Sequence, residues 1–370
     1  MKKALAISAI ILVCLVLVFL VARNHETQNA PQGKPIVKIG MILPLSGDAA
    51  AMGKAAQNAA ALFMEDLKKK DTKYDYVLIW EDNGFHLNRS VLVAKKLISF
   101  DKADALVTLF SNIATVVKPV ADESKILQMS ISTDKRTADG IYNFAIGTSA
   151  QQESAAFLKE LEKRSIKTVD AILVNISGVQ LTWDTFKKLA EQAGTVKIRN
   201  VYTINPGERD FDMMITKIMQ NPPDAIVAQV IMPEIDILMR RFKEKGNKIP
   251  VTGMENFSYL ENKHLADGLW YVDVATSVGD FAARYKAKTG EADTHYSELT
   301  YAALQVLVDG YEKAASADKK PTSEAVAAAI NQHKQFKTVM GATTLDDHGM
   351  MDTNATVKEV MDGKASVIGE

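Results

Sequence analysis

The sequence predicts an α/β protein with two doubly wound, Rossmann-like lobes behind an N-terminal apolar segment. The chain has 370 residues, of which 47% are hydrophobic and 24% charged, which is typical of globular domains. From residue 34 onward, short β-rich runs alternate with longer stretches of helical period, the pattern of parallel sheets covered by helices. This stretch is too long for one comfortable hydrophobic core, so we expect two lobes.

Composition and motifs exclude several classes of function. The 44 basic and 45 acidic side chains nearly cancel, so the chain lacks the surplus positive charge that neutralises nucleic-acid phosphates. One cysteine, Cys14, and six histidines offer little for disulfides or metal sites. The sequence contains no Walker A motif, dinucleotide fingerprint, nucleophile elbow or HExxH motif. We therefore expect no nucleic-acid partner, no metal, no cofactor and no enzymatic activity.

The first 22 residues are typical of a targeting segment. Lys2 and Lys3 precede an uncharged run from Ala4 to Ala22, which as a helix would measure about 28 Å and nearly span a bilayer core. The candidate cleavage tripeptide Leu20-Val21-Ala22 has a bulky residue where a small one is needed. We predict an uncleaved membrane-spanning anchor at 1–22, with a cleaved signal as the alternative. The basic end should stay in the cytoplasm, which places the body outside.

The first predicted lobe begins after a polar tether at 23–34. The run from Ile36 to Leu43 is rich in β-formers, and the alanine-rich stretch from Gly53 to Lys70 ends in basic residues that suit a helix C-terminus. The same reasoning predicts further strands at 76–80, 105–109 and 126–130, and helices at 89–100 and 114–123.

A second series of elements repeats this pattern. We predict helices at 151–163, 182–192, 211–219 and 234–245, and strands at 171–174, 196–202 and 225–230. In parallel sheets the loops after the strands' carboxyl ends share a crevice, and the following helices point their positive ends into it. A ligand should therefore bind between the lobes.

Four blocks of sequence resemble a known family. Residues 39–69, IGMILPLSGDAAAMGKAAQNAAALFMEDLKK, are similar to the opening of the type I periplasmic solute-binding proteins, in particular the branched-chain amino-acid (leucine/isoleucine/valine) family of ABC transporters. Residues 109–132, 142–152 and 225–253 resemble later blocks of that family in the same order. The resemblance covers essentially the whole exported chain.

The resemblance implies two lobes joined by three crossover segments, which close on a ligand by a hinge motion. We expect the crossovers near Gly147, Thr276 and Gly341. The first lobe would then comprise residues 35–147 and 277–341, and the second lobe residues 148–276 and 342–370.

The resemblance also implies ligand-binding residues on the first lobe. Met52 stands where the family has an aromatic lid. Ser111 and Asn112 correspond to small polar residues after the third strand, where a hydroxyl and free backbone N–H groups can hold a carboxylate; alternatively, Ser111 only caps a helix. Ser132, Thr133 and Asp134 correspond to a hydroxyl-rich strand end. Asp134 either faces a ligand cation or caps the turn before Lys135.

On the second lobe the departures from the family pattern are larger. Gly178 and Val179 stand where the family has a clamping tyrosine, and Trp183 either refills that space or packs in the core. Glu255 corresponds to the acid that pairs with an α-ammonium group in amino-acid binders; the alternative is a solvated loop acid. Ser111 and Glu255 on opposite lobes would suit a zwitterion, because each end of the ligand would then favour the closed form.

These features lead to one main functional expectation. We expect a membrane-tethered, extracytoplasmic solute-binding component of an ABC-type importer, which captures an amino acid or similar small polar metabolite and presents it to a membrane permease. The alternative is a tethered sensor that signals through a partner membrane protein. An enzyme is the third possibility, but the sequence offers no set of nucleophile, base and orienting partner.

Overall fold

The computed structural model describes residues 33–255, 257, 260, 262–315 and 319–368. Residues 36–370 form one compact unit, distinct from the segment 1–35, and every arrangement below lies within that unit. The predicted anchor at 1–22 and nearly all of the tether lie outside the described residues. Within the part of the chain that is described, no helix is both long and apolar enough to cross a bilayer.

The first of two sheets has the strand order β11-β12-β13-β5-β4-β3-β1-β2. The six strands from β13 to β2 run parallel to one another, and the central strands are completely buried. The strands are β1 (Ile36–Leu43), β2 (Asp75–Asp82), β3 (Ala105–Leu109), β4 (Leu127–Ile131), β5 (Asn143–Gly147), β11 (Gln335–Thr338), β12 (Gly341–Leu345) and β13 (Met350–Asp352).

The second sheet has the order β15-β14-β10-β9-β8-β6-β7. The strands from β10 to β7 are parallel, whereas β14 and β15 run antiparallel to their neighbours. The strands are β6 (Thr168–Val174), β7 (Lys197–Ile204), β8 (Ala225–Gln229), β9 (Val251–Met254), β10 (Trp270–Val274), β14 (Ala355–Met361) and β15 (Lys364–Val367).

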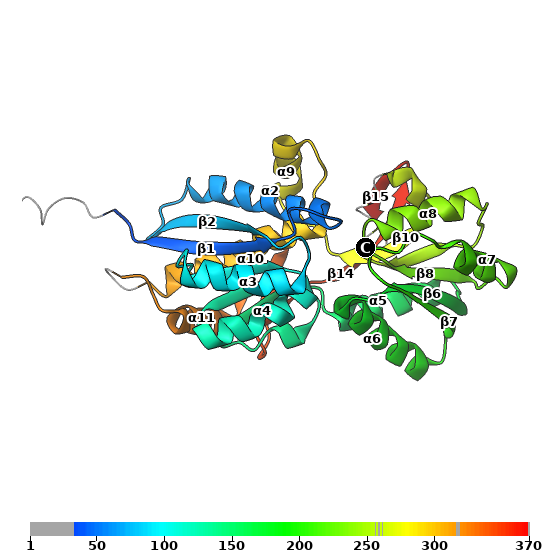
Figure 1. Cartoon of the computed structure of the whole chain (residues 1–370), viewed down its shortest axis with the longest axis horizontal. Coiled ribbons are helices and arrows are strands. Elements are labelled where there is room, and N and C mark those ends of the chain that lie inside the picture. The colour runs from blue at the N-terminus through cyan, green and yellow to red at the C-terminus, as the bar shows by residue number, and fades with distance from the viewer. Residues whose placement is uncertain (1–32, 256, 258–259, 261, 316–318, 369–370) are drawn as a thin grey trace, which may run out of the picture. The chain divides into compact units, whose positions relative to one another are not determined.

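Helices cover both faces of the sheets (Figure 1). Beside the first sheet, α2 packs against α10, and α3 packs against α4. Beside the second sheet, α5 packs against α6. The helices are α2 (Ala50–Leu67), α3 (Leu87–Ser99), α4 (Ser111–Ser124), α5 (Ala150–Lys163), α6 (Ser177–Ala193), α7 (Asp212–Gln220), α8 (Glu234–Glu244), α9 (Phe281–Thr289), α10 (His295–Lys313) and α11 (Ser323–His333).

Each sheet has a topological switch point. In the first sheet the chain order reverses between β1 and β3, and in the second it reverses between β6 and β8. Ligands of doubly wound sheets bind outside the strand carboxyl ends at such points. The loops after β1 and β3 in the first sheet, and after β6 and β8 in the second, are therefore placed to meet a ligand.

Two expectations about the sheets are wrong in part. Both sheets are mixed rather than wholly parallel, because short antiparallel strands complete one edge of each. The segment after Gly341 was expected in the second lobe, yet β12 and β13 belong to the first sheet, and the chain enters the second sheet only at Ala355. The physical reason is that Met350–Asp352 pairs in parallel with β5 and extends the first sheet by one more strand.

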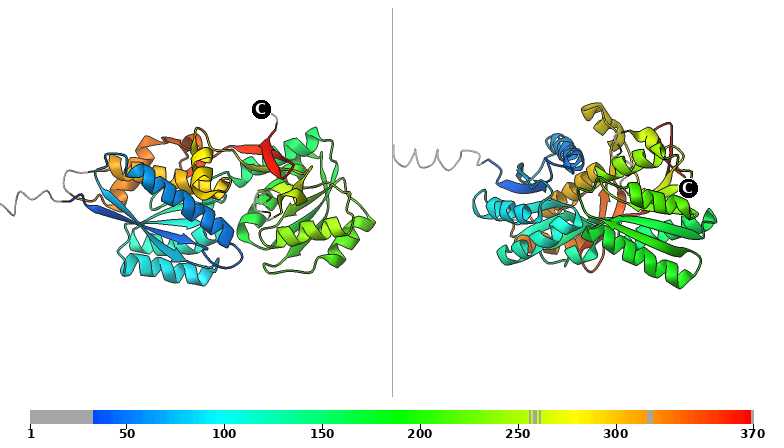
Figure 2. Two further views of the ribbon diagram at one scale, coloured as in Figure 1. Left: turned by 90° about the horizontal axis from the view of Figure 1, so that it is seen from above. Right: turned by 45° about the vertical axis from the view of Figure 1, so that its right-hand side comes forward.

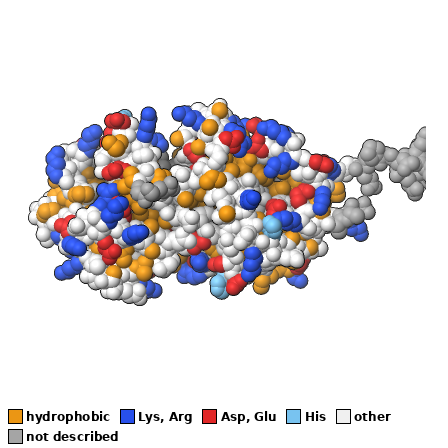
Figure 3. All heavy atoms as spheres, turned by 180° about the vertical axis from the view of Figure 1, so that it is seen from behind, with side chains coloured by type: hydrophobic (Ala, Val, Ile, Leu, Met, Phe, Trp, Pro, Cys, Tyr) orange, Lys and Arg blue, Asp and Glu red, His pale blue; other side chains and the backbone are white. Residues whose placement is uncertain are grey.

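The chain also passes between the sheets after Gly147 and after Val274. In Figure 2 the orange segment that includes α11 lies beside the first sheet, and the red C-terminal strands that follow it in the chain lie beside the green elements of the second sheet. On the face shown in Figure 3, basic and acidic side chains are interspersed, in keeping with a formal net charge of −1.

Candidate functional site

A cavity of about 70 Å³ lies where the carboxyl ends of the two sheets face each other. Its walls come from the ends of β3, β4, β5, β6, β8 and β9, from the loops and helix starts that follow them, and from the beginning of α10. Most of the residues that the sequence singled out line this cavity: Ser111, Asn112, Ser132, Thr133, Gly178, Val179 and Glu255.

A cluster of hydroxyl groups forms the first-sheet side of the cavity. Leu109 pairs with Ile131 at the ends of β3 and β4, so the residues that follow these strands lie side by side. The Oγ of Ser111 accepts hydrogen bonds from the Ser132 hydroxyl at 2.9 Å and from the Thr133 backbone N–H at 3.2 Å. These bonds fix the Ser111 oxygen at the N-terminus of α4.

Ser111 is not the capping residue of α4. The N-cap position is held by Phe110, and no side-chain capping bond is present there. The Ser111 backbone N–H therefore belongs to the first turn, whose N–H groups have no partners within a helix. A hydroxyl and a helix N-terminus at one wall of a cavity suit a carboxylate.

The second-sheet side approaches this cluster closely. A Cβ atom placed on Gly178, in the first turn of α6, would lie 3.6 Å from the Ser111 Oγ and 3.9 Å from the Thr133 Oγ1. Val179 is buried and lines the cavity next to Gly178. The absence of a side chain at Gly178 thus leaves the space in front of the hydroxyl cluster open.

Backbone strain occurs on both sides of the cavity. Phe110 has φ of 78° and Glu255 has φ of 59°, a left-handed region that residues other than glycine rarely adopt. Such conformations cost about 1–3 kcal/mol each and gather at ligand sites. Phe110 is held by ring packing, with Phe85 at 4.9 Å and Tyr296 at 5.0 Å between ring centroids.

Glu255 is the acidic residue of the loop after β9. Its backbone N–H donates to the carbonyl oxygen of Val272 in β10 at 2.6 Å, which ties the loop to the neighbouring strand. The side chain lines the cavity and is partly buried, so the alternative of a fully solvated loop acid does not describe it.

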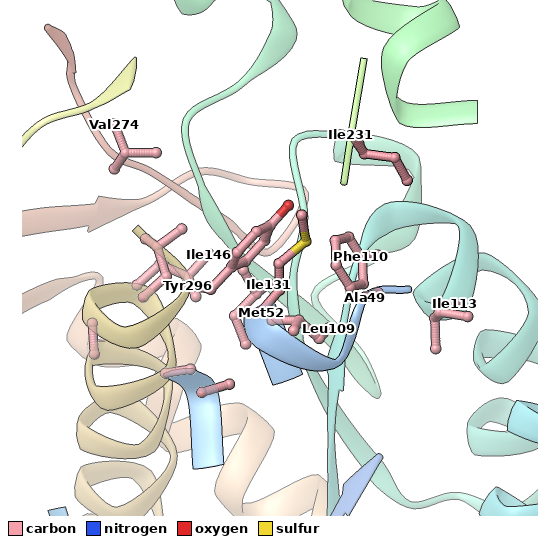
Figure 4. Close-up of a cluster of buried hydrophobic side chains, with 14 of the residues drawn as sticks. Ala49, Met52, Leu109, Phe110, Ile113, Ile131, Ile146, Ile231, Val274 and Tyr296 are labelled. Atoms are coloured by element: carbon pink, nitrogen blue, oxygen red, sulfur yellow. The ribbon is translucent and has the colours of Figure 1, made fainter. Parts of the chain in front are cut away.

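Three other predicted residues do not line the cavity. Met52 is fully buried in the hydrophobic cluster shown in Figure 4, with Phe110, Ile131 and Tyr296. Asp134 is 3% exposed. Its carboxylate accepts a hydrogen bond from the backbone N–H of Arg136 at 2.9 Å and forms an ion pair with the Arg136 guanidinium at 2.7 Å. Asp134 therefore caps the turn, as the second of the two expectations had it.

Trp183 is the third of these residues. It packs on Phe186 at a centroid distance of 5.3 Å and is 3% exposed. The core-packing alternative therefore describes its position.

The cavity also includes polar residues that the sequence analysis missed. They are Thr148, Glu153, Thr182, Gln229, His295 and Tyr296. The only sequence signal for Glu153 was its place in the first turn of a predicted helix, where acidic residues are common for reasons of helix stability. His295 begins α10, far along the chain from every block that pointed to the site.

Glu153 has an unusual environment. It is 1% exposed, and its Oε1 atom lacks a hydrogen-bond partner among the described residues. Burial raises the pKa of Glu153 well above its ordinary value, and the neighbouring carboxyl group of Glu255 raises it further. Asp273 and Asp352 add to the same effect. Glu153 is therefore a carboxyl group that retains its proton more readily than usual.

A buried charge cluster lies next to this pair. The Asp273 carboxylate contacts the Nζ of Lys358 at 2.8 Å and the Nδ1 of His295 at 3.1 Å. Burial alone would raise the pKa of Asp273, but Lys358 and His295 lower it. Burial likewise opposes the charge on His295, but Asp273 and Glu255 raise its pKa overall. His295 thus links the start of α10 to the last parallel strand of the second sheet.

The sequence matches a family model described as periplasmic binding protein over residues 36–365. This agrees with the resemblance found in the sequence. The Leu/Ile/Val-binding protein BraC3 of Rhizobium johnstonii is 24% identical over 334 residues, which cover 86% of this chain and 90% of that protein. A Leu/Ile/Val-binding protein homologue of Brucella melitensis is 23% identical over 330 residues, covering 85% and 88%.

Solved structures share the fold. The substrate-binding protein LivJ of Streptococcus pneumoniae, in complex with isoleucine, has a TM-score of 0.80 at 20% identity and covers 90% of this chain and 99% of its own. A solute-binding protein of an ABC transporter from Rhodopseudomonas palustris, in complex with 3,4-dihydroxybenzoic acid, has a TM-score of 0.79 at 18% identity, covering 90% and 96%. The same fold therefore holds ligands with and without an amino group.

Proposed function

Since the chain belongs to the type I periplasmic binding proteins of the branched-chain amino-acid family, we propose that it is the extracytoplasmic solute-binding component of an ABC-type importer. It captures an amino acid or similar small polar metabolite between its two sheets and presents it to a membrane permease. The targeting segment at 1–22 directs the body out of the cytoplasm and tethers it to the membrane.

One observation carries the proposal. A hydroxyl cluster at a helix N-terminus, centred on Ser111, and a carboxyl group, Glu255, line the same cavity from opposite sheets. The first wall suits a carboxylate because the helix dipole and the hydroxyl groups favour negative charge. The second wall suits an ammonium group because a charge-assisted hydrogen bond to a carboxylate is strong.

Ligand capture then follows from geometry. A zwitterion binds Ser111 and Thr133 with one end and Glu255 with the other. Each half of the site alone binds only one end of the ligand. The ligand therefore binds best when the two walls approach each other, and this differential affinity shifts the population toward the closed form. The three chain passages between the sheets are the positions where the molecule bends.

The charge of the cavity favours an amino acid over an aromatic acid. A benzoate-type ligand, as in the relative from Rhodopseudomonas palustris, brings an anion but no cation. In this chain such a ligand would place its own negative charge in a cavity lined by Glu255 and would leave that carboxyl group without a cationic partner from the ligand, which is unfavourable. An amino acid brings the missing positive charge.

Thermal-shift measurements on the purified full-length chain test this function. L-amino acids are compared with benzoate and 3,4-dihydroxybenzoate, because a ligand that binds only the folded protein raises its melting temperature. We expect a rise with at least one amino acid and none with either benzoate. A rise with benzoates alone would refute the amino-acid assignment.

A further inference from the structure

Glu153 and Glu255 are two neighbouring carboxyl groups that line the same ligand cavity. Two neighbouring carboxylates are both acceptors and repel each other, so one proton held by the pair relieves that repulsion in a buried place. Glu153 belongs to α5 and Glu255 to the loop after β9, so the second sheet alone builds the pair.

The pair is incomplete as it stands. The Oε1 atom of Glu153 accepts no hydrogen bond from the described part of the chain, although the residue is only 1% exposed. Orphaned buried acceptors are costly, about 1–3 kcal/mol, and in native proteins they indicate a missing partner. The cavity beside Glu153 is the place from which that partner can come.

The charged groups around the pair show which partner fits. Asp273 of β10 and Asp352 at the end of β13 act on Glu153 with negative charge. His295 of α10 acts on Glu255, but His295 and Lys358 of β14 are both paired with Asp273. The donor that Glu153 lacks is therefore best supplied by a cation from outside the protein.

We propose that Glu153 and Glu255 form a two-carboxyl site that holds one shared proton without ligand and exchanges that proton for the primary ammonium group of an amino-acid ligand. The inference rests on the proposed function and names Glu153 as a further residue that determines specificity. An ammonium group has three N–H donors, enough for both carboxylates at once.

The exchange conserves charge. Before binding, the pair carries one negative charge and one proton. The ligand enters as an ammonium ion, the shared proton leaves to water or buffer, and both carboxyl groups become carboxylates around the ammonium. No covalent bond of the ligand changes. Binding should therefore release close to one proton per ligand and strengthen as pH rises, up to about tenfold per pH unit.

Isothermal titration calorimetry in buffers of different ionisation enthalpy measures the released protons. The probes are L-leucine, L-isoleucine, L-threonine and L-alanine, added to the full-length chain between about pH 5 and about pH 8. We expect proton release with the wild type and with Glu162→Gln, an exposed acid on the same helix. We expect almost none with Glu153→Gln, which still binds through Glu255 with at most about a tenfold loss.

A second measurement needs no ligand. Infrared spectra of the ligand-free chain should contain a carbonyl band of a protonated carboxyl group that Glu153→Gln and Glu255→Gln both remove and Glu162→Gln leaves in place. Amino-acid binding should also abolish this band in the wild type.

The outcomes separate the two proposals. Amino-acid binding without proton release would overturn the exchange and leave the proposed function intact. Failure of all four amino acids to bind, with a shift by benzoate, would overturn both. Absence of the infrared band would overturn the shared proton whatever the ligand.

Discussion

Gly178 faces Ser111 across the cavity, and a Cβ atom at Gly178 would lie 3.6 Å from the Ser111 Oγ. Ser111 begins α4, which follows a strand of the first sheet, and Gly178 lies in α6, which follows a strand of the second sheet. Their separation leaves room for one methyl group but not for a long side chain in front of the hydroxyl cluster.

Substitutions at Gly178 should therefore depend on size. Gly178→Ala puts a methyl group at ordinary contact distance and should change amino-acid affinity by no more than a few-fold. Gly178→Leu should lower affinity by at least about tenfold, roughly 1.4 kcal/mol, because its branches fill the space in front of Ser111. Calorimetric titration with the same amino acid measures both variants. Equal affinity for the alanine and leucine variants would mean that the ligand does not sit there.

Removal of the Ser111 hydroxyl should weaken binding directly. Ser111→Ala takes away an oxygen that organises Ser132 and Thr133, and a hydrogen bond to a charged group contributes about 1.5–3 kcal/mol. We expect a loss of at least tenfold in affinity.

Ser130→Ala is the matched control for Ser111. Ser130 is buried in β4, two residues before Ser132. It donates to the carbonyl of Phe144 at 3.1 Å and does not line the cavity. Its loss should lower the melting temperature and leave affinity unchanged. If Ser130→Ala weakens binding as much as Ser111→Ala, the effect comes from stability alone.

Asp134 should matter for stability and not for binding. It caps the short 3-10 helix Lys135–Thr137 and pairs with Arg136, so Asp134→Ala should cost about 1 kcal/mol of unfolding free energy, as the loss of a helix cap does. Chemical denaturation measures that cost. Affinity for amino acids should stay within about twofold, and a tenfold fall would place the carboxylate at the ligand after all.

The pH dependence of stability tests the environment of Glu153. Its pKa in the folded chain is raised by burial and by Glu255, so the folded state binds the proton more tightly than the unfolded state. The stabilisation is complete below the ordinary glutamate pKa and is lost as pH rises through the raised value.

Glu153→Gln removes this titration. Its melting temperature relative to wild type should therefore rise between about pH 5 and about pH 8 in the absence of ligand. Glu162→Gln should follow the wild-type curve throughout. A constant difference between Glu153→Gln and wild type over this range would contradict the raised pKa.

Much of the fold could be predicted from the sequence because its signals are local. The run Ile36–Leu43 forms β1 with the predicted bounds, since a buried parallel strand needs a continuous apolar segment. The strands at 341–352 escaped prediction. They are three to five residues long, and their place in the first sheet depends on pairing with β5, about 200 residues earlier, which no local pattern encodes.

The site divides in the same way. Ser111, Thr133 and Glu255 could be found because the family resemblance points to these positions. Ser111 and Thr133 also lie shortly after predicted strands, whose ends meet at one edge of a sheet. Glu153 and His295 lie in first turns of helices, where acids and polar residues serve helix stability in most proteins. Only the tertiary structure brings Glu153 next to Glu255.

The central claim is that the cavity holds a small zwitterion by both ends. Calorimetric titration of the full-length chain with L-isoleucine, 3-methylpentanoate and 2-methylbutylamine tests it directly, since the second probe lacks the ammonium group and the third lacks the carboxylate. We predict that L-isoleucine binds and that each truncated analogue binds at least about a hundredfold more weakly, roughly 2.7 kcal/mol. Binding of 3-methylpentanoate as tightly as L-isoleucine would contradict the account.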